Sequence, residues 1–124
     1  MRFMMINKTN EHFEAGNPPS PELLARMGAF MEETAKSGVL LQAEGLMPSV
    51  AGARVSVRNG STTVIDGPFA EAKELIGGFA VIQARSREEA VQWAIRFAAV
   101  HGDDVDVEIR QLSEMADVES VPVG

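Results

Sequence analysis

The 124-residue sequence contains no cysteine and no tyrosine, and Trp93 is its single tryptophan. Without cysteine the chain can form neither a disulfide bond nor a thiolate nucleophile, and it cannot hold zinc through thiolates. The shortage of aromatic rings also leaves few side chains on which nucleic-acid bases could stack.

Positive charge is scarce as well. Eleven Lys and Arg residues stand against eighteen Asp and Glu residues, for a net charge of −7. Such a chain repels nucleic acid and anionic membranes. Arg54 and Arg58 come closest to a basic patch, and two arginines are too few to bind DNA. The sequence therefore predicts neither a nucleic-acid partner nor a membrane partner.

Long apolar runs are missing too. The apolar start of the chain, residues 3–6, ends at Asn7-Lys8 and is far too short for a signal peptide or a membrane span. We therefore expect a cytoplasmic protein. The length suits one domain with a substantial core. We place this domain at residues 1–112, followed by an acidic C-terminal tail at 113–124.

Hydrophobic periodicity predicts an alternation of strands and helices. Ser20-Pro21 starts one helix, Ser86 to Glu89 forms a capping box that starts another, and Asn59-Gly60 is a strong hairpin signal. We predict a polar loop over 10–19. The expected helices cover about 21–37 and 86–100, and the expected strands cover about 2–8, 39–46, 54–58, 61–65, 79–84 and 105–110.

This order predicts an α+β protein, a ferredoxin-like α/β sandwich with an inserted β-hairpin. Two helices can cover only one face of its sheet. Because residues 3–6 are all apolar, half of these side chains must point to the uncovered face, and exposed apolar patches usually mark interfaces. We expect a homodimer in which two sheets pack face to face. The alternative is a monomer whose residues 113–124 fold across that face.

One stretch also carries a family resemblance. Asp66-Gly67-Pro68-Phe69, continued by Ala70-Glu71-Ala72-Lys73-Glu74-Leu75-Ile76-Gly77-Gly78-Phe79, resembles the DGPF-domain branch of the YCII-related family. The resemblance extends through residues 19–23, 28–30, 43–46 and 48–49 and covers about 1–112. It implies a dimeric α/β-barrel and small bacterial proteins without an established general activity. Some DGPF genes lie beside genes for extracytoplasmic-function sigma factors, which implies a possible regulatory partner.

Three departures from the family pattern delete polar groups. Leu23 stands where the shorter YCII branch has a histidine that pairs with an aspartate, so that dyad is broken here. Ala72 replaces a frequent threonine, and Met47 stands where many relatives carry a polar residue. These departures weaken a catalytic interpretation of the resemblance.

Asp66 is the main candidate for chemistry. It ends a predicted strand at a tight turn, where its carboxylate can either cap the turn or face a cleft as a general base. Glu44, Glu71 and Lys73 are further candidates for ligand binding, with Lys73 placed to bind a substrate anion. The alternative for Glu71, Lys73 and Glu74 is a set of solvated charges on a loop.

The remaining candidates favour structural roles. Gly77-Gly78 allows close backbone approach, for packing or for a ligand. His12 suits a solvated loop, and His101 suits the negative end of a helix dipole. Two histidines do not specify a metal site, so we expect no metal and no cofactor. The methionines, with Met27 and Met31 among them, suit core packing or an adaptable pocket lining.

Three functions are compatible with these features. The first is a protein that binds a small molecule near Asp66 in an accessory or sensing role. The second is a cofactor-independent isomerase or lyase that uses Asp66 as its base. The third is an interaction module for an extracytoplasmic-function sigma factor.

Overall fold

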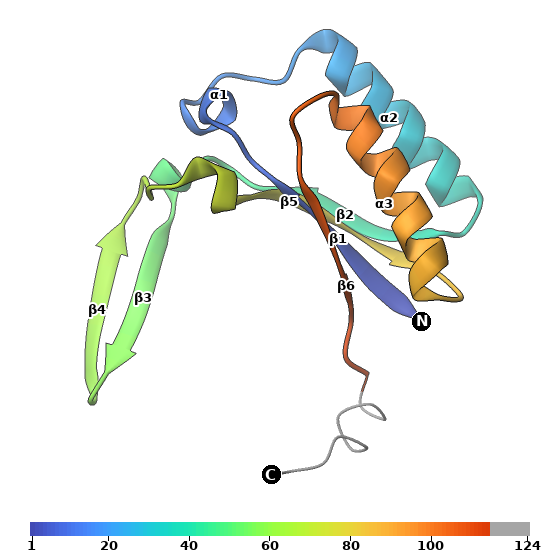
Figure 1. Cartoon of the computed structure of the whole chain (residues 1–124). Coiled ribbons are helices and arrows are strands. Elements are labelled where there is room, and N and C mark those ends of the chain that lie inside the picture. Colours follow the sequence, from blue (N-terminus) through green and yellow to red (C-terminus); the bar gives the residue numbers. More distant parts are fainter. Residues whose placement is uncertain (115–124) are drawn as a thin grey trace.

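The computed structural model describes residues 1–114 except the side chain of Lys73, so most of the expected tail lies outside it. Figure 1 shows the chain with its elements labelled. In chain order these are β1 (Arg2–Lys8), α1 (Glu11–Glu14), α2 (Pro21–Lys36), β2 (Leu40–Gly45), the 3₁₀ turn η1 (Ser49–Ala51), β3 (Ala53–Arg58), β4 (Ser61–Asp66), the 3₁₀ turn η2 (Ala72–Glu74), β5 (Ile76–Gln83), α3 (Arg87–His101) and β6 (Val107–Gln111).

Four strands form one sheet in the order β2-β5-β1-β6, and every neighbouring pair in it is antiparallel. The other two strands, β3 and β4, pair only with each other. The predicted α+β class is therefore confirmed. The strand order is compatible with a ferredoxin-like fold that carries an inserted hairpin.

The long helices begin at the residues that the sequence indicated. Ser20 Oγ accepts the N–H of Leu23 at 3.1 Å, and Ser86 Oγ accepts the N–H of Glu89 at 3.1 Å. The second half of the predicted capping box does not form, because the Glu89 carboxylate binds Arg85 Nε at 2.8 Å instead.

The prediction of a loop over residues 10–19 is wrong for residues 11–14, which form the single helical turn α1. Asn10 caps this turn, since its Oδ1 accepts the N–H of Phe13 at 3.0 Å. Asparagine is among the best N-cap residues, and this signal was present in the sequence.

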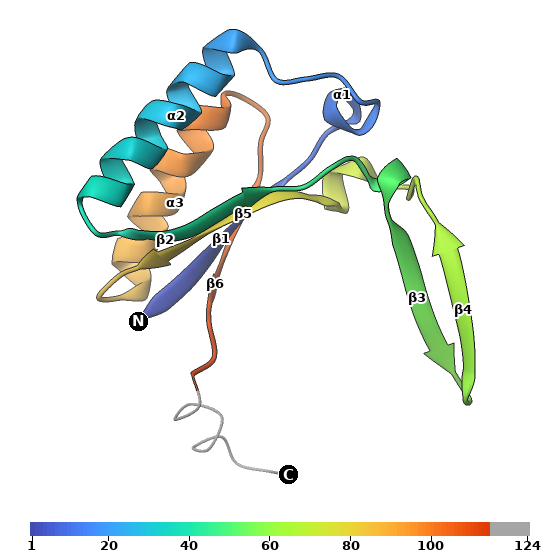
Figure 2. The ribbon, with the colours of Figure 1, turned by 180° about the vertical axis from the view of Figure 1, so that it is seen from behind.

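The core lies between the sheet and the two long helices, which cover one face of the sheet (Figures 1 and 2). Alternate residues of β1 point into it, so Phe3 and Met5 are buried. The other buried members of this core are Phe30, Ala80, Ile82, Ala84, Ala90, Ala94 and Phe97.

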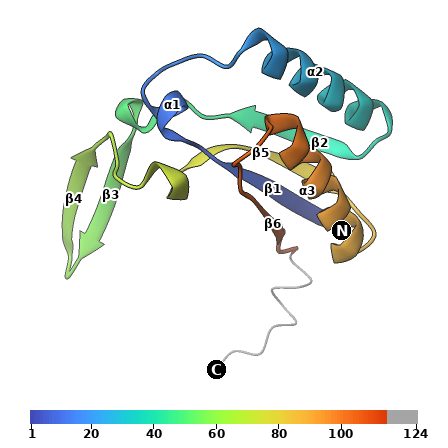
Figure 3. The same ribbon diagram turned by 45° about the horizontal axis from the view of Figure 1, so that its top comes forward.

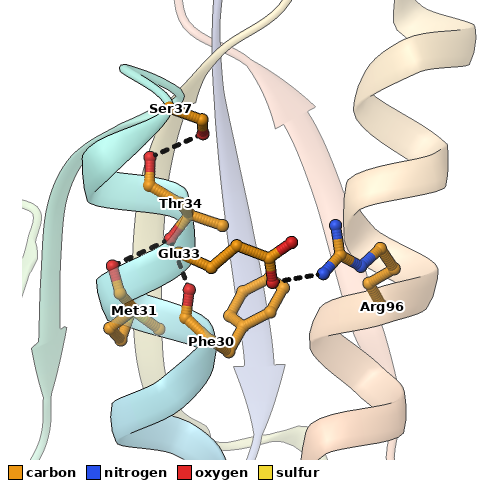
Figure 4. A network of polar contacts seen from close by, with 6 residues as sticks. All are labelled: Phe30, Met31, Glu33, Thr34, Ser37 and Arg96. Atoms are coloured by element: carbon orange, nitrogen blue, oxygen red, sulfur yellow. Dashed lines mark hydrogen bonds and ion pairs between the residues drawn. The ribbon is translucent and has the colours of Figure 1, made fainter.

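Figure 4 shows polar contacts near Phe30, most of them within α2 and one, between Glu33 and Arg96, joining α2 to α3. Thr34 is buried, and its hydroxyl donates to the carbonyl of Phe30 at 2.8 Å, so no polar atom is left unpaired there. Arg96 spans the two helices by donating to Glu33 at 2.6 Å. Its guanidinium also lies over the Trp93 ring, 4.8 Å from the centroid.

The opposite face of the sheet carries no helix among the described residues. Met4 lies opposite Val81, and Ile6 lies opposite Phe79, so these four side chains form an apolar strip, which we call the open face. Val81 is buried, while Met4, Ile6 and Phe79 are half-buried. On β6, charged side chains border the strip, because Arg110 lies opposite Met4 and Glu108 opposite Ile6.

The β3–β4 hairpin projects from the end of the sheet where β2 stops and β5 begins (Figures 1 and 3). Its turn has the predicted form, since Asn59 and Gly60 both have positive φ, at 51° and 80°. In every view the hairpin extends on the side of the sheet away from the long helices (Figures 1, 2 and 3).

A junction of three remote segments holds the base of the hairpin. Ser49 of η1 donates its N–H to Glu14 Oε1 at 2.9 Å and its hydroxyl to Glu14 Oε2 at 2.5 Å. The same Ser49 Oγ accepts the N–H of Phe69 at 3.0 Å. The Phe69 ring lies beneath the guanidinium of Arg54, 4.1 Å from ring centroid to Cζ. Two segments that carry the family resemblance therefore contact each other, Pro48-Ser49 and Asp66 to Phe69.

Gly67 is required at this junction. Its N–H donates to the Gly52 carbonyl at 3.0 Å, and a Cβ at position 67 would overlap the backbone carbonyl group of Ser49. Gly52 lies nearby but has room, since a Cβ there would meet the Ser49 oxygen at an ordinary 3.5 Å.

We expect Gly67→Ala to lower the free energy of unfolding by about 1–3 kcal/mol, because the backbone of the junction must move to admit the methyl group. Gly52→Ala is the matched control and should change it by less than about 0.5 kcal/mol. Urea denaturation followed by circular dichroism measures both. Equal effects of the two substitutions would contradict the close contact at Gly67.

Candidate functional site

A cavity of about 600 Å³ opens at the end of the sheet where β1 and β2 stop and β5 begins. The segment from α1 to the start of α2 borders it on one side, and the end of α3 borders it on another. A volume of this size is typical of small-molecule sites.

Apolar side chains make up much of the cavity wall. Helix α2 contributes Leu23, Met27 and Met31 at helical spacing, and Phe97 of α3 and Ala43 of β2 also line it. Met27 and Met31 are half-buried and pack against the core. The two sequence-based interpretations of these methionines, core packing and adaptable pocket lining, therefore apply together.

Gly77 and Gly78 bring the backbone of β5 against the side chain of Asn7. A Cβ at Gly77 would lie 3.1 Å from Asn7 Nδ2, and one at Gly78 would lie 3.1 Å from Asn7 Oδ1 and 2.9 Å from the Glu44 carbonyl oxygen. These glycines therefore let the Asn7 amide pack closely against the strand backbone, and all three residues line the cavity.

His101 supplies the one imidazole among the cavity-lining residues. It is the last residue of α3, and its Nδ1 donates to the Phe97 carbonyl at 2.8 Å. Burial lowers the pKa of His101 below its ordinary 6.5, although the bond to Phe97 acts in the opposite direction. The imidazole is therefore neutral at pH 7, with its proton on Nδ1 and a lone pair on Nε2. No residue described in the structure bonds Nε2, so this atom can accept a hydrogen bond or a proton.

The sequence reasoning assigned His101 only a helix-dipole role and missed this placement. A usable signal was present, because residues 90, 94, 97 and 101 continue one stripe along the inward side of α3. Ala90, Ala94 and Phe97 of this stripe are buried. A histidine at the end of a buried stripe, beside the polar segment 102–104, indicates the rim of a pocket.

The residues predicted as the site lie in three places. Glu44 is exposed at the end of β2 and is among the residues that line the cavity. Asp66 is exposed at the end of β4, opposite Ala53, and Glu71 is exposed with a left-handed φ of 63°. Neither of the latter two lines the cavity. The side chain of Lys73 lies outside the described part of the chain.

Within residues 1–114, no group of three or more His, Asp or Glu side chains is arranged to hold a metal ion. The described helices also include none that is long and apolar enough to cross a bilayer.

The partly buried imidazole of His101 predicts a pH dependence of stability. When the pH falls below about 6.5, His101 takes up a proton more readily in the unfolded chain than in the folded one, because its folded pKa is lowered. The free energy of unfolding should therefore decrease as the pH is lowered from 7.5 to 5.5. This decrease should be smaller in His101→Phe, which cannot titrate.

Urea denaturation at the two pH values measures the effect. Ile95→Phe is the matched control, since it changes an exposed, non-titrating side chain of the same helix, and it should keep the pH dependence of the wild type. If His101→Phe and the wild type lose stability equally, His101 is not buried as described.

Comparison with known proteins bears on the identity of the chain. The family model of the YCII-related domain matches residues 1–115. An uncharacterised protein of Rhizobium meliloti (strain 1021) is 32% identical over 87 residues, which cover 70% of each chain. These matches agree with the resemblance seen in the sequence motifs. The chain belongs to the YCII-related domain family.

Proposed function

We propose that this protein binds a small molecule in the cavity beside His101 and acts in an accessory or sensing role. The observation that carries the proposal is a cavity of about 600 Å³ that combines an apolar wall with an unpaired acceptor on a neutral imidazole. Binding sites commonly pair apolar walls with a few placed polar groups.

The cavity residues favour a particular kind of ligand. Leu23, Met27 and Phe97 suit an apolar body, and the flexible thioether of Met27 can adapt to its shape. Nε2 of His101 requires a hydrogen-bond donor, because it carries only a lone pair in the neutral ring. A compact apolar molecule with one N–H or O–H group meets both requirements.

A proton-transfer enzyme is the second candidate, and the same imidazole favours it. A general base needs a lone pair within reach of the substrate and a pKa near the working pH. His101 Nε2 has this lone pair beside the cavity, whereas Asp66 is exposed at the end of β4. The base of such an enzyme would then be His101, with Asp66 and Glu71 as predicted contacts outside the cavity and Lys73 as a further predicted contact.

Indole is a suitable probe, since it is flat and apolar and carries one N–H donor. We expect a dissociation constant of about 1 mM, because nine heavy atoms at about 0.45 kcal/mol each supply about 4 kcal/mol. N-methylindole lacks the donor and should bind several-fold more weakly, by roughly 1 kcal/mol. Titrations followed by ¹⁵N NMR measure both constants and locate the perturbed amides.

His101→Phe is the control variant, because it keeps a ring against Phe97 and removes the acceptor. In this variant the two indoles should bind equally. Perturbed amides should fall on Leu23, Met27 and Ala43, and Asp66→Asn should leave binding unchanged. Perturbations confined to residues 66–74 would instead support the site predicted from the sequence and would contradict the cavity.

We also propose that the protein is a homodimer whose two open faces pack together. Met4, Ile6, Phe79 and Val81 supply a continuous apolar strip on a sheet face that no described helix covers. Apolar strips of this kind usually form interfaces. The charged side chains of Glu108 and Arg110 beside the strip would lie near the rim of such an interface.

Met4→Lys tests the dimer. A lysine in the middle of the open face would be buried without a partner, which should weaken association roughly 100-fold, by about 3 kcal/mol. Size-exclusion chromatography with light scattering should give twice the 13.3 kDa chain mass for the wild type and the chain mass for the variant. Ile95→Lys, on the exposed side of α3, is the control and should remain dimeric. A wild-type mass of one chain at every concentration would overturn the dimer.

A further inference from the structure

The β3–β4 hairpin exposes an unusual amount of apolar side chain. Val55 is 66% exposed, Val57 59% and Val64 61%. The register pairs Val55 with Val64 and Val57 with Thr62, so the three valines lie on one face of the hairpin, which we call the valine face. Arg54, Ser56 and Arg58 alternate with them and lie on the other face.

The hairpin lacks support along its length. Every residue of β4 is exposed, and Ser56 alone is half-buried in β3. An isolated two-stranded hairpin is marginally stable at best in water, because it has no layer against which to bury its side chains. The contacts at its base, with Ser49 and Phe69, hold its position but leave the valine face uncovered.

The charge of the hairpin is opposite to that of the chain. Residues 54–65 include Arg54 and Arg58 and no acidic residue, while the whole chain carries −7. Within residues 1–114, neither arginine forms an ion pair with a carboxylate. A second copy of this chain offers an excess of carboxylates to this positively charged segment, whereas nucleic acid would be repelled by the rest of the molecule.

The direction of the hairpin favours the same partner. It extends on the side of the sheet that the long helices leave free, the side on which the open face lies (Figures 1 and 2). A second copy seated on the open face would therefore lie beside the hairpin.

We propose that the hairpin is a dimerisation arm whose valine face packs on the second copy of this chain. The inference rests on the proposed dimer and adds the arm to its interface. In the dimer each arm reaches across to the other subunit, so the hairpin is covered by its partner and not by its own chain.

Two measurements test the arm. The first compares dimer dissociation constants of the wild type and of Val55→Thr/Val57→Thr/Val64→Thr, which keeps β-branched side chains and removes only apolar surface. We expect the constant to rise at least tenfold. Ser56→Thr/Thr63→Ser, on the other face, is the matched control and should leave the constant unchanged.

The second measurement uses the absence of cysteine. Val55→Cys gives a chain with one thiol, which can carry an environment-sensitive fluorophore. Its emission should shift to the blue as the concentration rises through the monomer–dimer transition measured by light scattering. Thr63→Cys carries the same fluorophore on the other face and should shift less.

The outcomes separate the arm from the dimer. If the dimer dissociation constant does not change with the valine substitutions and the Val55→Cys fluorophore stays in solvent, the proposed arm is wrong. The open-face dimer is then still supported. An emission that is already blue-shifted in the monomer, at concentrations below the monomer–dimer transition, also overturns the arm, because the chain then covers its own hairpin. A monomer at all concentrations overturns both proposals.

Discussion

The organisation of this protein depends on one constraint, that two helices cover only one face of a four-stranded sheet. Because side chains alternate along β1, Phe3 and Met5 bury against α2 and α3 while Met4 and Ile6 lie on the open face. The residues on the helix side supply the core. Those on the open face leave an apolar strip that a folded monomer of residues 1–114 does not cover with a helix, and this strip is the physical basis for the proposed dimer.

A second consequence appears at the end of the sheet, where the helices no longer cover it. There the segment 9–20 crosses above the strand ends, and the cavity lies between this segment, α2 and the end of α3. Glu14 joins this region to the hairpin base through its two bonds to Ser49. Residues 66–69 therefore connect the hairpin base to η1, because Gly67 packs against Ser49 and the Phe69 N–H donates to the Ser49 hydroxyl. The charges beside the motif, Asp66 and Glu71, are exposed.

Local signals predicted most of the fold correctly. Ser20 and Ser86 cap helices as expected, and Asn59-Gly60 turns the hairpin, because caps and tight turns depend on residues close together in the chain. The same reasoning overlooked the Asn10 cap of α1, although its signal was equally local. The candidate site was harder to predict. Asp66 was predicted as the site because it is an acidic residue at a tight turn, whereas the cavity lies beside His101 and is lined by residues of β1, α2, β2, β5 and α3.

The sequence by itself determined the α+β class, the order of the strands and long helices, the hairpin turn and the family, since each follows from periodicity, local backbone preference or a contiguous motif. Only the tertiary structure decided that Ser49 meets Phe69, that Asn7 lies on Gly77-Gly78 and that His101 keeps an unpaired nitrogen beside a cavity. The first two contacts join segments 20 or more residues apart in the chain. The state of the His101 ring depends on its burial, which the fold decides. Neither long-range contact nor burial is encoded in any short stretch of the chain, because both arise when the sheet and helices pack.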